Sequence, residues 1–130
     1  MTTYKFSKKS RISSKDDFKT VLDYKLFYRN ELMTLYMAPK STAKPRFAVS
    51  ISSKTAPAAI RNRLKRLARE AFRLSQNEVA DSFDYFVIYS TRLSKKANSD
   101  IKKITLSQVK QGFVELAEQG RRRFEKERNK

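Results

Sequence analysis

The segment 57–75 combines an apolar stripe with basic side chains, and it constrains the fold more than any other part of the chain. Pro57 suits the first turn of a helix, because its missing N–H would be unpaired there anyway. Apolar residues then recur with the 4-3-4-3 spacing of one helix face; they are Ile60, Leu64, Leu67, Ala71 and Leu74. The spacing predicts a helix that runs to about Ser75 or Gln76 and packs this stripe on a core.

The opposite side of this predicted helix is positively charged. Six basic side chains lie between residues 61 and 73, and Glu70 is the one acidic residue among them. With about 100° of rotation per residue, the side chains opposite the stripe are Asn62, Arg66, Arg69 and Arg73, and those that flank it are Arg61, Arg63 and Lys65. A helix with this much charge on one face is typical of contact with a polyanion, most often a nucleic acid.

The whole chain is also basic, with a formal net charge of +17 from 30 Lys and Arg against 13 Asp and Glu among 130 residues. A membrane surface is the rival polyanion, but the apolar stripe of the basic helix is narrow and lacks aromatic residues. No apolar run of about 18 residues predicts a spanning helix either. The first residues lack the apolar stretch of a secretory signal, and without cysteine there is no disulfide framework. We therefore expect a cytoplasmic single-domain protein that binds nucleic acid, without a membrane partner or an obligate protein partner.

Histidine and cysteine are both absent, which excludes Ser-His, Cys-His and His-zinc sites. The acidic residues are scattered and lack the paired spacing of a metal nuclease. Gly112 and Gly120 are the only glycines, so a glycine-rich phosphate loop is excluded as well. We expect no catalytic and no metal-ligating residue in this chain; if it belongs to an enzyme, another component carries the chemistry.

Periodicity and capping signals along the chain predict an α+β fold. Helices are expected over 14–24, over 57–76 and from Thr105 to a stop at Gly120, with strands over 26–29, 32–38, 46–54 and 84–90. The order α-β-β-β-α-β-α describes a single-domain sandwich in which about three helices cover a mainly central β-sheet. We expect one nucleic-acid-binding domain over 11–120, a flexible basic N-terminus over 1–10, and a charged tail over 121–130 that is either frayed or a helical extension.

Two of the expected strands carry further information. In the strand over 46–54, apolar residues alternate with the small residues Ala48, Ser50 and Ser52. This small, polar face next to a basic helix offers a surface on which an extended nucleic acid strand can lie. The strand over 84–90 is apolar on both faces, which predicts a central position. The strand–helix–strand connection through 46–90 would ordinarily be parallel and right-handed.

The segment from Arg46 to Phe72 carries a long motif of mixed character. An Arg-φ-small-φ-Ser-φ-Ser strand, where φ is apolar, is followed by a lysine and then by Arg-Asn-Arg-φ-Lys-Arg-φ-x-Arg-Glu-x-Phe. With this motif the chain resembles the family of protein subunits of bacterial ribonuclease P. The similarity extends over roughly Arg11 to Leu116.

The resemblance implies an accessory subunit of a ribonucleoprotein endonuclease. In this family a catalytic RNA, with Mg²⁺ that is bound mainly by the RNA, hydrolyses the phosphodiester that joins the 5′ leader to a precursor tRNA. The implied partners are therefore the ribonuclease P catalytic RNA and precursor tRNA, and the implied role is tRNA maturation. Family members also cross between strands around the basic helix with left-handed topology, so the resemblance implies a left-handed βαβ crossover.

The resemblance also implies two RNA-binding surfaces. Residues of the basic helix match the motif that contacts the catalytic RNA: Arg61, Asn62, Arg63, Lys65, Arg66 and Arg69. A cleft between the first helix and the sheet is expected to hold the single-stranded leader, with Arg11, Phe18, Tyr36, Ser50 and Lys54. The residues alone leave two interpretations of Phe18 and Tyr36, core packing or base stacking.

Two other functions stay open at this point. A ribosomal or general RNA-binding protein would bind many RNAs and leave the processing of precursor tRNA unchanged. A self-sufficient nuclease would cut precursor tRNA with Mg²⁺ in the absence of a catalytic RNA, although the missing histidine and the dispersed carboxylates disfavour it.

Overall fold

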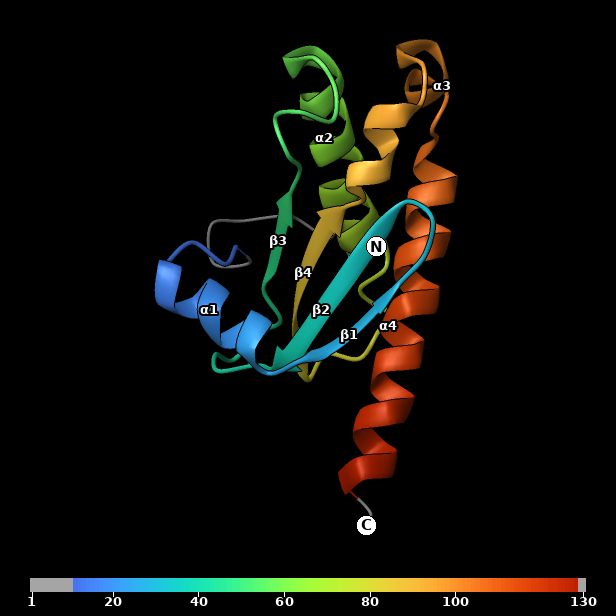
Figure 1. Cartoon of the computed structure of the whole chain (residues 1–130). Coiled ribbons are helices and arrows are strands. Elements are labelled where there is room, and N and C mark those ends of the chain that lie inside the picture. The colour runs from blue at the N-terminus through green and yellow to red at the C-terminus, as the bar shows by residue number, and fades with distance from the viewer. Residues whose placement is uncertain (1–10, 129–130) are drawn as a thin grey trace.

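The structure, a computed structural model, describes residues 11–128 (Figure 1). In chain order its elements are α1 (Lys15–Asp23), β1 (Leu26–Arg29), β2 (Met33–Pro39), β3 (Phe47–Ser50), α2 (Ala58–Leu74), β4 (Phe83–Tyr89), the 3₁₀ helix η2 (Thr91–Lys95), α3 (Asn98–Lys102) and α4 (Leu106–Arg128). The expected α+β class is confirmed, and two short elements that were not expected, η2 and α3, precede the last helix. The flexible N-terminus expected over 1–10 lies outside the described residues.

β4 lies inside a four-stranded sheet with the strand order β1-β2-β4-β3 (Figure 1). β1 pairs antiparallel with β2, and β2 pairs antiparallel with β4, whereas β3 pairs parallel with β4. The central position predicted for the strand over 84–90 is therefore correct, because β4 buries Tyr85 on one face and Phe86 on the other. α2 connects the two parallel strands, and the left-handed crossover stays a prediction.

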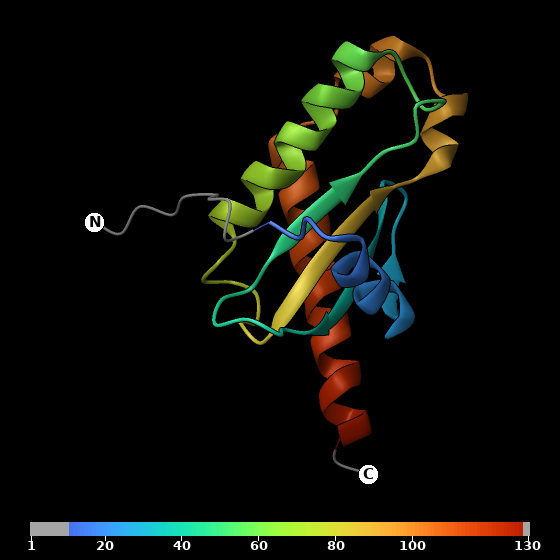
Figure 2. The same ribbon diagram turned by 90° about the vertical axis from the view of Figure 1, so that its left-hand side faces the viewer.

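Helices cover both faces of the sheet, with α2 and α4 on one face and α1 on the other (Figure 2). The larger core lies between the sheet and the α2–α4 pair. In it Phe47 stacks on Phe72, with ring centroids 4.8 Å apart, and Phe113 meets both rings edge-on. A smaller core lies under α1 and consists of Ile12, Val21, Ala38, Ala48 and Phe86.

The inward face of α2 differs from the predicted stripe toward its C-terminal end. Leu67 is only half-buried and Leu74 is 39% exposed. Ala68 and Phe72 take their places in the core. A 4-3-4-3 spacing drifts by about 20° per heptad relative to a straight helix of about 3.6 residues per turn. The last residue of the stripe therefore rotates away from the sheet.

Gly120 does not end the last helix as predicted. α4 continues to Arg128, so the helical extension, one of the two alternatives for the tail, is present up to that residue. A methyl group on Gly120 would collide with Sδ of Met37 on β2, and one on Gly112 would lie 2.7 Å from Nδ2 of Asn30. Glycine at these positions allows α4 to approach the sheet closely, which offsets a cost of about 1 kcal/mol for a glycine inside a helix.

The helix starts follow the capping signals in the sequence. The Oγ atom of Ser14 accepts a hydrogen bond from the N–H of Asp17 at 3.1 Å, at the start of α1. Thr105 and Gln108 form a reciprocal capping box at the start of α4, with distances of 2.9 and 3.2 Å. Pro57 takes the N-cap position of α2, one residue before the helix begins. β3 is shorter than the expected strand and ends at Ser50.

Candidate nucleic-acid interface

Three polar side chains, Asn62, Arg66 and Arg69, lie exposed on the solvent side of α2. Within residues 11–128 neither of these arginines takes part in an ion pair. Glu70, the one acidic residue of the helix, pairs with Arg73, which holds the pKa of that carboxyl below its usual range. The solvent side of α2 therefore presents positive charge with little compensation on the helix itself.

Arg61 and Arg63 make hydrogen bonds to the protein, unlike the exposed cations of α2. The Nε–H group of Arg61 donates to the carbonyl oxygen of Ala56 at 3.0 Å. Arg63 donates from Nη2 to the carbonyl oxygen of Ile104 at 2.7 Å, and its Nη1 is buried without a hydrogen-bond partner. Arg63 therefore ties α2 to the segment between α3 and α4, so part of its donor capacity serves the fold. Lys65 is half-buried.

A further group of cations lies at the end of the molecule where α2 begins. α3 packs against α2, and both α3 and the start of α2 lie at the upper end of Figure 1. Residues 92–103 carry five exposed cations and one acidic residue, Asp100; the cations are Arg92, Lys95, Lys96, Lys102 and Lys103. This run of charge is visible in the sequence, but without a helix period it indicates no common surface, and none of these residues was expected to bind RNA.

The sheet face next to α1 carries a row of mostly aromatic side chains. Cross-strand pairing sets one residue of each strand beside the next, and this row is Phe27, Tyr36, Phe86 and Ala48. Phe18 of α1 is half-buried, with its ring centroid 5.1 Å from that of Phe86. Tyr36 is half-buried as well, and its ring centroid lies 5.1 Å from that of Phe27. Phe18 and Tyr36 thus pack on the small core and also retain accessible surface.

A second row on the same face is more polar and consists of Arg29, Thr34, Ile88 and Ser50. Ser50 is exposed at the end of β3, where the chain leaves the sheet toward α2. Lys54 is exposed in the turn between β3 and α2. The exposed end of this row therefore continues toward the basic helix.

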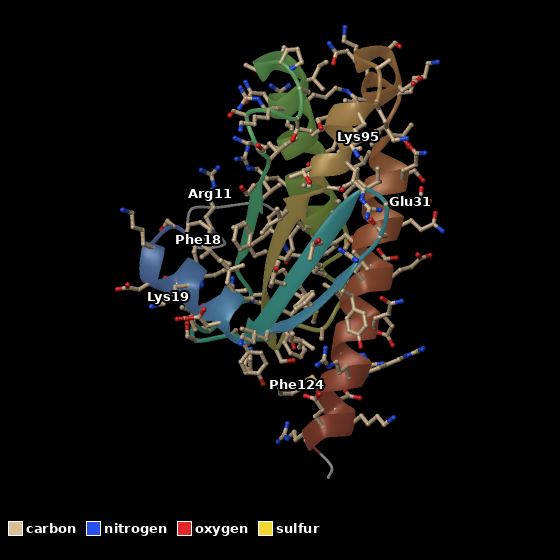
Figure 3. All side chains as sticks on the ribbon, viewed as in Figure 1. Arg11, Phe18, Lys19, Glu31, Lys95 and Phe124 are labelled. Atoms are coloured by element: carbon tan, nitrogen blue, oxygen red, sulfur yellow. The ribbon has the colours of Figure 1, made fainter. Side chains whose placement is uncertain are left out.

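Arg11 lies at the margin of this face, directly before α1. Its backbone forms an isolated parallel bridge with Phe47 of β3. Figure 3 shows Arg11 and Phe18 near one another, between α1 and β3. The structure thus brings Phe18, Tyr36 and Ser50 to one face of the sheet and sets Arg11 at its edge.

An ion-pair network that was not expected from the sequence holds α1 against this face. Arg46, directly before β3, donates to the carboxylates of Asp17 on α1 at 2.8 Å and of Asp84 on β4 at 3.0 Å. Asp84 is 2% exposed, and its other oxygen accepts the backbone N–H of Arg46 at 2.9 Å. The hydrogen bond from Arg46 lowers the pKa of the Asp17 carboxyl. The network fixes the position of the helix that carries Phe18.

Within residues 11–128, no group of three or more acidic, histidine or cysteine side chains is arranged to hold a metal ion. Across the same part of the chain, no helix has both the length and the apolar character that crossing a membrane requires.

The sequence matches the family model of ribonuclease P over residues 6–116. The ribonuclease P protein component of Dictyoglomus turgidum is 28% identical over 119 residues, which cover 91% of this chain and 94% of that protein. The ribonuclease P protein component of Clostridium acetobutylicum is 30% identical over 97 residues, which cover 73% of this chain and 82% of that protein.

Solved structures share the fold. The ribonuclease P protein from Thermotoga maritima matches with a TM-score of 0.71 at 23% identity, over 84% of this chain and 96% of that chain. The ribonuclease P protein of Staphylococcus aureus matches with a TM-score of 0.66 at 21% identity, over 82% of this chain and 91% of that chain. Because the family model covers most of the sequence, the chain belongs to the ribonuclease P family, as a protein component of this ribonucleoprotein endoribonuclease of tRNA processing.

Proposed function

We propose that this chain assists ribonuclease P by binding two RNAs on two surfaces. α2 binds the catalytic RNA through the matched motif residues, which are the exposed Asn62, Arg66 and Arg69 and the half-buried Arg61, Arg63 and Lys65 that flank them. The sheet face next to α1, called the leader face below, binds the 5′ leader of precursor tRNA with Arg11, Phe18, Tyr36, Ser50 and Lys54. The catalytic RNA hydrolyses the phosphodiester between leader and tRNA in the cytoplasm.

The uncompensated charge on α2 is the observation that carries this proposal. Arg66 and Arg69 are exposed, and Arg73 already neutralises Glu70. Each phosphate that such a cation contacts releases counterions. For each contact, the slope of log affinity against log salt concentration, called the salt slope below, therefore becomes steeper by about 0.7–0.9. The five cations of residues 92–103 extend this surface toward the end of the molecule. A large folded RNA with closely spaced phosphates fits this distribution of charge.

The sheet face next to α1 suits a single strand of variable sequence. The accessible parts of Phe18 and Tyr36 can stack any base, since every base has a π-face, and stacking contributes about 1–3 kcal/mol per base. The Ser50 hydroxyl and the Arg11 and Lys54 cations can contact phosphates, which carry no sequence information. Holding the leader in this way would favour precursor tRNA over mature tRNA.

Mg²⁺ is assigned to the RNA in this proposal. The described residues contain no group of side chains arranged as a metal site, and the proposal gives none of them a ligand role. When bound to the RNA, Mg²⁺ would activate the attacking water and stabilise the leaving oxygen. The contribution of the chain is to hold RNA phosphates and the leader in fixed positions.

Reconstitution tests the proposal. The purified chain is mixed with its cognate ribonuclease P RNA at low Mg²⁺, and removal of the 5′ leader from a precursor tRNA is measured with and without protein. We expect the protein to stimulate cleavage and to cut nothing alone. Failure to stimulate an RNA that is active by itself at high Mg²⁺ would leave a general RNA-binding protein. Cleavage by the protein alone would identify a nuclease.

A matched pair of variants tests the role of α2. Arg66→Gln with Arg69→Gln removes two charges from the proposed surface, and Arg122→Gln with Lys126→Gln removes two exposed charges from the end of α4. We expect the first pair to weaken binding of the catalytic RNA and to reduce the salt slope by about 1.4–1.8, the value for two phosphate contacts. The second pair should leave both quantities near the wild-type values. Equal effects of both pairs would refute a specific role for α2.

A further inference from the structure

The edge strand β1 presents an aromatic ring and a cation on the sheet face next to α1. Leu26 of β1 is buried in the larger core, whereas Phe27 is 43% exposed on the opposite face. Phe27 is paired with Tyr36, and their ring centroids lie 5.1 Å apart with an interplanar angle of 33°. The row of rings that begins under α1 therefore continues to the edge of the sheet.

Packing does not account for the exposure of Phe27. A ring that is 43% exposed at a sheet edge buries only part of its apolar surface and so contributes only part of its possible stabilisation. An exposed apolar residue on an edge strand also favours unwanted strand pairing. Tyr24 is the comparable case, 46% exposed at the end of α1, but it has no cross-strand partner in the sheet. Phe27 thus differs by its alignment with Tyr36, which orients a free ring surface along the leader face.

Arg29 supplies a cation next to this ring. It is exposed and lies on the same side of β1 as Phe27, because side chains two residues apart share a face at a spacing of about 6.8 Å. Within residues 11–128 no acidic side chain forms an ion pair with Arg29. It is also the β1 end of the polar row that runs through Thr34 to Ser50.

We propose that Phe27 and Arg29 form an outer subsite for one nucleotide of single-stranded RNA. The base stacks on the Phe27 ring, and the Arg29 guanidinium pairs with a phosphate. This subsite lies three strand spacings, about 14 Å, from Ser50 on β3, so a leader that crosses this face from β3 toward β1 reaches it last. The inference rests on the proposed leader function and extends it to a contact that only longer leaders can make.

Leader length separates this subsite from the rest of the face. Precursor tRNAs whose leaders shorten by one nucleotide at a time are bound to the holoenzyme under conditions that suppress cleavage, and the affinity of each is measured. For wild-type protein we expect affinity to rise with leader length in steps. Phe27→Thr, which keeps strand propensity, should remove the last step, a loss of about fivefold for stacking worth about 1 kcal/mol. Arg29→Gln should lower the salt slope by about 0.7 for long leaders only.

The matched control is Tyr24→Thr, which removes a ring of similar exposure outside the row and should leave every step unchanged. Circular dichroism and thermal melting verify that all variants are folded. If Phe27→Thr changes short and long leaders equally, or changes neither, the subsite is refuted. If Phe18→Ala and Tyr36→Ala still weaken leader binding in that case, the proposed function stands without the subsite. If they too have no effect, the leader function itself fails.

Discussion

Replacement of Asp84 by alanine tests whether the buried ion-pair network holds the two layers of the protein together. Asp84 is 2% exposed and accepts two hydrogen bonds from Arg46, one from the backbone N–H at 2.9 Å and one from Nη2 at 3.0 Å. The Arg46 side chain is 11% exposed, and its remaining carboxylate partner, Asp17, is 36% exposed. Asp84→Ala therefore leaves a nearly buried guanidinium with one partner at the protein surface.

The expected loss is about 3 kcal/mol in the free energy of unfolding. Breaking a buried ion pair by removing one partner costs about 3–5 kcal/mol, and Asp17 retains part of the interaction, which favours the lower end. A chain of this length has a total stability of about 6–20 kcal/mol at 0.05–0.15 kcal/mol per residue. The variant should stay folded at 25 °C, with a melting temperature lowered by on the order of 10 °C.

Urea unfolding followed by circular dichroism at 222 nm measures this loss. Asp23→Ala, at the exposed C-terminal end of α1, is the control and should change stability by less than about 0.5 kcal/mol. The double variant Arg46→Met with Asp84→Ala should lose less stability than the sum of the losses of the single variants. Each single variant leaves one buried charge without its partner, whereas the double variant removes both charges of the pair. A loss below about 1 kcal/mol for Asp84→Ala would contradict the reasoning, as would strict additivity in the double variant.

Three further outcomes follow from the structure. Arg63→Ala should cost about 1–2 kcal/mol of stability because it removes the bond to the Ile104 carbonyl, whereas Arg66→Ala should leave the urea midpoint unchanged. Glutamine at the four lysines between 95 and 103 should lower the salt slope for the catalytic RNA without changing the melting temperature, and an unchanged slope would exclude this end from the interface. Because Arg46 lowers the pKa of Asp17, that carboxylate contributes stability above its unfolded pKa of about 4, and the contribution is lost as pH falls through the lower folded value. Asp17→Asn should therefore make the free energy of unfolding fall less steeply as the pH is lowered. An unchanged pH dependence in the variant would exclude Asp17 as a cause of the acid destabilisation.

The predictable parts of this fold depend on short-range signals. Ser14 caps α1, and Thr105 and Gln108 cap α4, with partners three residues away, so the sequence contains the whole interaction. The parts that sequence analysis missed depend on distant contacts. Arg46 meets Asp84 38 residues away, and a basic residue in a motif gives no sign of such a partner.

The candidate site shows the same division. The exposed position of Arg66 on α2 follows from helical spacing alone. The bond from Arg63 to the Ile104 carbonyl spans 41 residues, so periodicity could assign Arg63 only to the flank of the helix. Gly120 matched a helix stop by its residue type, but the real constraint is the nearby side chain of Met37, which no local rule contains.

α1 and α2 lie on opposite faces of one sheet, so the two proposed RNA-binding surfaces are separate (Figure 2). This separation has a consequence for turnover. In the proposed complex, precursor tRNA has two attachments, its body to the catalytic RNA and its leader to the protein. The covalent link between the segments makes the second attachment effectively intramolecular, which raises the overall avidity above that of either contact. Hydrolysis breaks this link, and each product is left with one attachment. Hydrolysis of this phosphodiester therefore also weakens the binding of both products.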